Sequence, residues 1–255
     1  MRVALSFLTR LPVGQLTVED YMTALGREVP WFPVVGLTVG LCAAAADWAA
    51  GLFFGEPVRA AAAMLAAVGV TGALHLDGLM DTADGVLSSR TRERMLEIMK
   101  DSRMGAMGVV TGALSLLVRF ALLVDIAAGL RWRALLLAPA LGRMSIALAM
   151  WAWPSARGRG QGMGGSAAAA VGPWQVAGAM AVGLLIAIGV GGWFRGGLAW
   201  LLALGAAALT ARSLAAKLGG LTGDTFGAIN EVVEIVILAL FAAVWRGVDW
   251  SWLPW

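Results

Sequence analysis

Three aspartates in the segment HLDGLMDTADG, residues 75–85, are spaced so that they could act together. If the segment is helical, Asp77, Asp81 and Asp84 lie on one face, because residues four and seven positions apart are neighbours around a helix. Like charges this close repel one another, so a cation is expected to neutralise them. Carboxylate oxygens suit hard ions, and Mg²⁺ binds a few carboxylates together with substrate phosphates. The alternative is that the aspartates cap a helix in a solvated loop.

Two further acidic segments favour the metal interpretation. MKDSRMG contains Asp101, and GDTFGAINEVVE contains Asp224, Glu231 and Glu234. Both segments are expected on the membrane face that carries residues 75–85, so Asp101 and Asp224 join the expected metal ligands. Glu231 and Glu234 share one side of a helix and are expected to point into the bundle, because lipid does not tolerate them.

Basic residues beside these carboxylates indicate phosphate chemistry. Lys100, Arg103 and Arg157 are expected to bind phosphate oxygens, which carry the charge that a metal leaves unbalanced. The glycine-rich stretch near 158–165, represented by Gly162, could add backbone N–H donors to an anion.

Two arginines fall inside apolar stretches. Arg143 lies near the middle of its stretch and is expected to meet a carboxylate or the substrate, since snorkelling to water from there is costly. Arg119 lies towards the other leaflet, and only Arg143 is assigned to the site.

The composition indicates which elements must position these groups. The chain has 255 residues, of which 60% are hydrophobic and 14% charged, and its mean hydropathy is +0.80. Such values are typical of an integral membrane protein and predict an all-α, polytopic bundle that forms one domain over residues 1–255. The single Cys42 and single His75 argue against metal sites built from several His or Cys ligands. Stretches of about 20 apolar residues, long enough to cross a bilayer, predict about seven membrane helices near 31–54, 57–75, 105–128, 134–152, 174–192, 197–216 and 229–246.

The charge distribution predicts the orientation. Seven helices put the N-terminus and the polar connections 76–104, 154–173 and 217–228 on one side. Most of the flanking Lys and Arg residues fall there, so this acidic side is expected to face the cytoplasm. The localisation that follows is the inner, or cytoplasmic, membrane, with membrane lipid around the helices.

Several strings together resemble the cobalamin synthase family, the adenosylcobinamide-GDP ribazoletransferases, over nearly the whole chain. They are FLTRLPV, WFPVVGLTVG, HLDGLMDTADG, MKDSRMGAMGVV, LAPALGRMSIALAMW and GGLTGDTFGAINEVVE. The resemblance implies a Mg²⁺-dependent inner-membrane transferase that joins adenosylcobinamide-GDP to α-ribazole or α-ribazole 5′-phosphate and releases GMP. ARGRGQGMGG departs from the glycine pattern of the family, so the position of Gly162 is open.

The expected mechanism assigns the catalytic roles to Asp81 and Asp84. Asp84 is chosen over Asp81 as the general base that takes the proton of the ribose hydroxyl. Asn230, Glu231 and Glu234 are expected to contact the substrate or to complete the metal site. His75 is interpreted as a packing or hydrogen-bonding residue at a helix end, because metal-assisted phosphoryl transfer needs no imidazole.

Two enzymatic alternatives and one transporter remain open. A Mg²⁺-dependent membrane prenyltransferase also presents aspartates from a helical bundle, but its motifs usually begin with Asn-Asp. The spacing Asp81-x2-Asp84-Gly85 resembles the start of the CDP-alcohol phosphotransferase motif, whose later aspartates do not follow. A transporter would place its charges near the midplane. No nucleic-acid partner is expected, and assembly into a homo-oligomer is left open.

Overall fold

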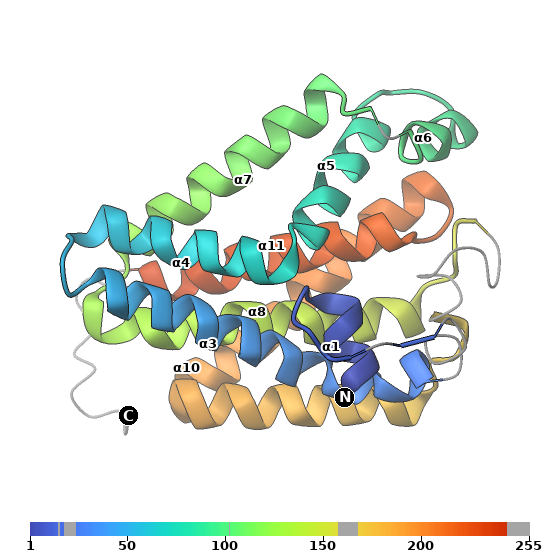
Figure 1. Ribbon diagram of the computed structural model, residues 1–255. Coiled ribbons are helices and arrows are strands. Elements are labelled where there is room, and N and C mark those ends of the chain that lie inside the picture. Colours follow the sequence, from blue (N-terminus) through green and yellow to red (C-terminus); the bar gives the residue numbers. More distant parts are fainter. Residues whose placement is uncertain (15, 18–23, 102, 158–167, 244–255) are drawn as a thin grey trace.

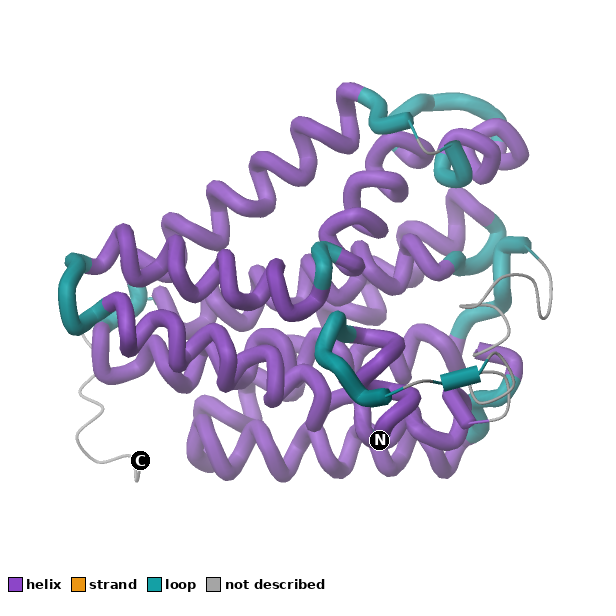
Figure 2. The backbone as a smooth tube through the Cα atoms, in the orientation of Figure 1, coloured by secondary structure: helices purple, strands orange, loops and turns teal. Residues whose placement is uncertain are grey.

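Helices make up almost all of the secondary structure that a computed structural model describes for residues 1–14, 16–17, 24–101, 103–157 and 168–243. In these ranges the only β-type pairing is an isolated bridge between Ser155 and Leu221 (Figures 1 and 2). The all-α prediction is therefore confirmed. The elements are α1 (Arg2–Leu8), η1 (Val29–Trp31), α3 (Phe32–Ala50), α4 (Glu56–Thr71), α5 (Leu74–Val86), α6 (Arg92–Ile98), α7 (Ala106–Asp125), α8 (Ala128–Ala152), α10 (Pro173–Leu218) and α11 (Gly223–Ala242).

Several of these helices can span a membrane. Within the described residues, five are long and apolar enough, and the bent pair α4 and α5 would make a sixth. The helix α10 is itself two segments that meet at Gly192, where φ is +75°. Trp200 Nε1–H donates to the carbonyl of Met180 at 3.2 Å, so the two segments run side by side in opposite directions. The multi-pass prediction is confirmed, and the count of seven stays a prediction.

The helix α8 lies at the centre of the bundle (Figure 1) and packs against α3, α10 and α11. Most of its residues are buried, including all of those from Ala134 to Ala147. Its closest neighbour is α3, because Gly36 and Gly40 present no side chain to it. A Cβ at Gly36 would overlap the carbonyl of Pro139, and one at Gly40 would lie 2.5 Å from the carbonyl oxygen of Leu135. Small residues four positions apart are a usual way for membrane helices to approach.

A sharp break separates the aspartate-bearing helix from the span before it. Gly72 and Ala73 both take left-handed backbone angles, with φ of +61° and +60°, and α5 leaves α4 at 86°. Residues 75–85 are therefore helical as predicted, but they form a helix of their own and do not continue the preceding span. The break turns the aspartates of α5 away from the line of α4.

The polar connections gather at one end of the bundle. In Figures 1 and 2, α1, the segment from α5 to α7, the described residues after α8 and the turn between α10 and α11 lie at that end. The loops between α3 and α4 and between α7 and α8 lie at the other. The sequence-based grouping of the acidic segments at one end is therefore found in the fold.

The contact between α3 and α8 gives a test of the packing. Gly36→Ala is expected to lower the free energy of unfolding by about 1–3 kcal/mol, because the new methyl group overlaps backbone of α8. Gly69→Ala is the matched control, since a Cβ there meets nothing within 4 Å. It is expected to be neutral or stabilising by up to about 1 kcal/mol. Thermal melting of both variants in one detergent measures the difference, and equal melting temperatures would contradict the packing.

Candidate active site

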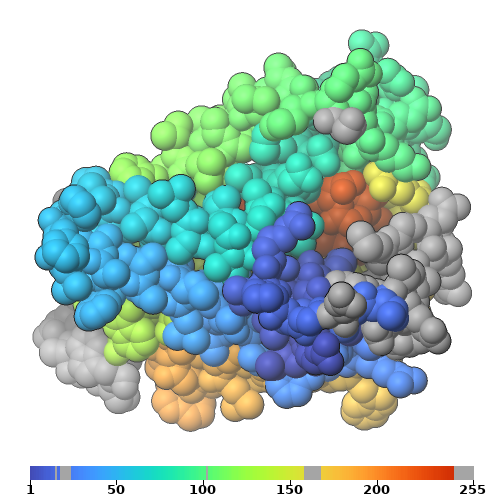
Figure 3. Space-filling model, in the orientation of Figure 1, coloured from blue at the N-terminus to red at the C-terminus, as the bar shows by residue number. Residues whose placement is uncertain are grey.

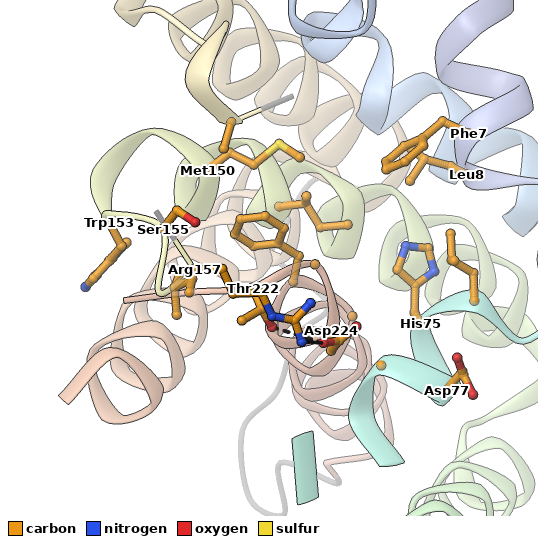
Figure 4. A pocket seen from close by; sticks show the side chains of 18 of the residues that line it. Phe7, Leu8, His75, Asp77, Met150, Trp153, Ser155, Arg157, Thr222 and Asp224 are labelled. Carbon is orange, nitrogen blue, oxygen red and sulfur yellow. Dashed lines mark hydrogen bonds and ion pairs between the residues drawn. The ribbon is translucent and has the colours of Figure 1, made fainter. Parts of the chain in front are cut away.

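A cavity of about 260 Å³ opens at the end of the bundle where the polar connections meet (Figure 4). Its apolar lining includes Phe7, Leu8, Ile146, Met150 and Phe226, and its polar lining includes His75, Asp77, Arg157, Thr222 and Asp224. In Figure 3 the orange-red surface of α11 is visible between α5 and the yellow residues that follow α8, so this region is open to the outside. Polar groups from three separate chain segments thus meet in one cavity.

The carboxylates of α5 and α11 face one another because the two helices touch through glycine. A Cβ on Gly78 would lie 2.7 Å from the backbone oxygen of Asp224. The charges of Asp77 and Asp224 both act on Asp81, which is half-buried beside them. The structure therefore brings together Asp77, Asp81 and Asp224, as the sequence predicted.

Arg157 reaches this acidic group through a short backbone pairing. Ala156 N–H donates to Leu221 O at 2.9 Å, and Leu221 N–H donates to Pro154 O at 2.8 Å. This pairing holds the end of α8 beside the start of α11, where an Arg157 guanidinium N–H donates to Asp224 Oδ2 at 3.2 Å. The predicted phosphate ligand Arg157 is thus part of the cavity.

The first turn of α11 also faces the cavity. Thr222 caps the helix, because its hydroxyl accepts the N–H of Thr225 at 3.3 Å, and the Thr222 N–H donates to Thr225 Oγ1 at 2.8 Å. Gly223 has open space where a side chain would be. A helix N-terminus with free backbone N–H groups favours anions.

Asp84 makes different contacts from Asp77 and Asp81. Its Oδ2 accepts the N–H of Gly105 and its Oδ1 accepts the N–H of Gly108, each at 2.7 Å. These N–H groups belong to the start of α7, so Asp84 caps that helix from 21 residues away. A Cβ at either glycine would overlap the carboxylate. Both oxygens of Asp84 are therefore held by backbone donors, and its predicted roles as metal ligand and general base stay predictions.

The predicted residues of the α6–α7 connection do not reach the cavity. Arg103 donates to both oxygens of Asp101, which lowers the pKa of that carboxyl to about 2. Asp101, Arg103 and Lys100 are all exposed, and none lines the cavity. Asp101 is therefore paired with Arg103 in its own loop, and it does not line the cavity with Asp77 and Asp224. Gly162 lies outside the described residues.

The oxygen donors of Asp77, Asp81 and Asp224 suit Mg²⁺, although the described residues do not form a complete set of metal ligands. Among the described residues, no three His, Cys, Asp or Glu side chains are close enough to hold a common ion. Asp77, Asp81 and Asp224 nevertheless supply only oxygen donors. Mg²⁺ is usually bound by one or two carboxylates and completed by substrate phosphates and water, so a preformed cage of protein ligands is not required.

Glu231 and Glu234 lie deeper, in a buried ion cluster. Arg119 Nη2 is 2.8 Å from Glu231 Oε2 and 3.0 Å from Glu234 Oε2. Arg143 forms an ion pair with Glu234, and the Asn230 amide donates to Glu234 Oε1 at 2.9 Å. The predicted interior position of both glutamates and the predicted carboxylate partner of Arg143 are therefore found. These residues, with Asn230, hold one another and do not line the cavity that contains Asp77.

Arg119 was missed by the sequence interpretation, which assigned only Arg143. Its side chain is 13% exposed and bridges both glutamates. The signal that could have found it is charge balance. Two glutamates inside an apolar bundle call for two cations, and Arg119 and Arg143 are the arginines that fall inside the predicted spans 105–128 and 134–152.

Comparison with known proteins identifies the family. A family model described as cobalamin-5-phosphate synthase matches residues 1–242. The chain belongs to the cobalamin-5-phosphate synthase family.

Two curated relatives of this cobalamin-5-phosphate synthase family member carry the name adenosylcobinamide-GDP ribazoletransferase. The protein from Roseiflexus sp. (strain RS-1) is 41% identical over 240 residues, which cover 92% of this chain and 86% of that protein. The protein from Brevibacillus brevis is 38% identical over 249 residues, covering 95% and 97% of the two chains. No solved structure matches this family member. The sequence resemblance to the family is thereby confirmed.

The helix-capping role of Asp84 can be tested by stability. Asp84→Asn is expected to lower the free energy of unfolding by about 1–2 kcal/mol, because the amide can accept only one of the two N–H groups. Asp81→Asn is the matched control and is expected to stay within about 0.5 kcal/mol of the parent chain. Denaturation of both purified variants in detergent gives the comparison. A fully stable Asp84→Asn variant would argue against the cap.

Arg119 provides a test of the buried cluster. Arg119→Met is expected to cost about 3–5 kcal/mol, because it leaves Glu231 and Glu234 to share one cation inside the bundle. Arg94→Met removes an exposed ion pair with Glu97, so its expected cost is below about 1 kcal/mol. The two melting temperatures, measured side by side, should differ clearly. If they agreed, the cluster would contribute nothing to stability.

Proposed function

We propose that the chain transfers the cobinamide phosphate of adenosylcobinamide-GDP to a ribose hydroxyl of α-ribazole or α-ribazole 5′-phosphate. A new phosphate ester bond forms to the ribose oxygen, the diphosphate bond breaks, and GMP leaves. The observation that carries the proposal is the family match over residues 1–242, together with curated relatives named for this transfer. The carboxylates that meet beside Arg157 supply groups suited to this chemistry.

Mg²⁺ is part of the proposal. Asp77 and Asp224 would hold the ion, with substrate phosphates as its further ligands, and when bound it would supply positive charge to the diphosphate. Arg157 and the backbone N–H groups at the start of α11 bind phosphate oxygens on the same side of the cavity. Their contacts would favour the transition state over the substrate to the extent that charge moves onto the leaving oxygen.

Asp81 is the proposed general base. It is half-buried, it lies one turn along α5 from Asp77, and unlike Asp84 it caps no helix in the described contacts. It would accept the proton of the ribose hydroxyl as the oxygen attacks phosphorus. Lys100 and Arg103, which are exposed beyond the cavity, would instead attract the anionic substrates from solution.

The buried cluster has a supporting role in this scheme. Arg119, Arg143, Glu231 and Glu234 join α7 and α8 to α11, and α11 carries Asp224. We assign these groups, and Asn230 with them, to positioning rather than to direct substrate contact.

The orientation of the site in the membrane and its lipid contacts are also proposed. The acidic end would face the cytoplasm from the inner membrane, because Lys and Arg concentrate there. Exposed side chains such as Leu117, Leu185 and Leu209 would contact membrane lipid.

The proposed transfer predicts a specific product. The purified chain, incubated with adenosylcobinamide-GDP, α-ribazole and Mg²⁺, is expected to release GMP and to stop when a chelator is added. Asp81→Asn is expected to lose at least about 100-fold in turnover, the usual contribution of a general base. Chromatography of the nucleotide products measures both effects.

Controls separate the proposal from its alternatives. Prenyl diphosphate with an aromatic acceptor is expected to give no product, and vesicles that hold the chain are expected to move no substrate without releasing GMP. Near-normal turnover of folded Asp81→Asn would remove this residue from the mechanism. Absence of GMP from the parent chain would overturn the proposed function.

A further inference from the structure

His75 lies where the active-site cavity meets the buried ion cluster. It is the second residue of α5 and is only 4% exposed. Its side chain lines both the cavity that contains Asp77 and a second cavity, of about 60 Å³, lined by Arg119, Arg143, Glu231 and Glu234. The mechanism proposed above does not use it.

The contact with Arg143 fixes which ring nitrogen of His75 carries the proton. His75 Nδ1 is 3.3 Å from Arg143 Nη2. A guanidinium has only donors, so Nδ1 must accept the bond and the imidazole is neutral with its hydrogen on Nε2. Arg143 cannot turn away easily, because it is paired with Glu234 and also donates to the carbonyl of Pro139 at 3.3 Å. The ion cluster thus holds His75 as an Nε2–H donor.

That donor has no protein partner within the described residues. His75 Nε2 is shielded from solvent, and it neither donates nor accepts a hydrogen bond among these residues. Figure 4 places the ring on the side of the cavity near Phe7 and Leu8, across from Arg157 and Asp224. A buried donor without a partner is costly, and apolar side chains cannot satisfy it. An acceptor atom on a bound ligand can.

The surroundings of the donor indicate the kind of acceptor. Phosphate oxygens would be drawn to Arg157 and the start of α11, on the opposite side of the cavity. The side near His75 is apolar and aromatic, which suits a flat ring that has a single acceptor atom. The volume of about 260 Å³ is below the usual 300–1,000 Å³ of pockets for whole drug-sized ligands. It suits one ring system and not a corrinoid.

We propose that His75 binds the benzimidazole ring of the α-ribazole acceptor by donating its Nε2–H to the ring nitrogen that bears no ribose. This nitrogen has a free lone pair and lies in an apolar bicyclic ring. With the ring beside His75, the attached ribose extends towards Asp77 and Asp81, where its hydroxyl must be to attack. The inference rests on the proposed function, and it assigns the recognition of the acceptor base to one side chain.

The test compares two acceptors that differ at one atom. In 1-(α-D-ribofuranosyl)-5,6-dimethylindole a CH group replaces the free ring nitrogen of α-ribazole. For the parent chain, the KM of the indole compound is expected to be about tenfold higher, the usual effect of one lost hydrogen bond to a buried donor. This measurement needs no variant. Equal KM values for the two acceptors would overturn the proposal.

Variants at position 75 then locate the donor. In His75→Phe the KM of α-ribazole is expected to rise to that of the indole compound, and the KM of adenosylcobinamide-GDP to stay unchanged. His75→Gln, whose amide can donate from a similar place, is expected to restore part of the preference. If His75→Phe raised the KM of both acceptors equally, His75 would be structural only. If it raised the KM of adenosylcobinamide-GDP instead, the donor would serve the guanine, and the proposal would fail. Absence of GMP from the parent chain with α-ribazole would be failure of the proposed function itself.

Discussion

The two ion pairs of Glu234 are the interaction on which the rest of the structure depends. Glu234 binds Arg119 from α7 and Arg143 from α8 while its own backbone belongs to α11. Charges buried in an apolar bundle are stable only when they are paired, because removing one partner leaves the other without water. Three helices are therefore held in one arrangement, and Arg143 extends the constraint to His75 in α5. These ion pairs thereby help to hold α5 and α11 in the arrangement that brings Asp77 and Asp81 close to Asp224.

Charged groups in this protein differ in how completely protein partners neutralise them. The carboxylates with the fewest partners are the ones to which a chemical role is proposed. Glu231 and Glu234 have two arginines, and Asp84 has two backbone N–H donors. Asp77, Asp81 and Asp224 have only Arg157 among the described residues that line the cavity. Carboxylates with too few cations repel one another, so this group gains most from a cationic ligand. The proposed Mg²⁺ and the phosphates it would bring match that imbalance.

The sequence predicted contacts that depend on local spacing and missed those that depend on how helices turn and meet. The helical spacing of Asp77 and Asp81, the interior glutamates and the buried partner of Arg143 follow from periodicity and from the cost of charge in lipid. The cap formed by Asp84 joins residues 21 and 24 positions apart, and no local pattern encodes it. Arg119 was missed because its side chain direction depends on the rotation of α7. The break before α5 uses Ala73 in a left-handed conformation, which sequence rules reserve mainly for glycine.

The 86° break between α4 and α5 explains how one chain combines a span with an acidic site. If α4 continued straight, Asp77 and Asp81 would belong to the same apolar helix and lie further along its direction. The turn instead lays α5 against the first residues of α11, where Gly78 and Gly227 remove the side chains that would separate the two helices. His75 comes directly after the turn and contacts Arg143 of the ion cluster. Gly78, which lies against the backbone of Asp224, follows within one helical turn. The proposed recognition of a ring and the proposed activation of a hydroxyl would therefore both belong to a single short helix, which the buried charges hold through the contact of Arg143 with His75.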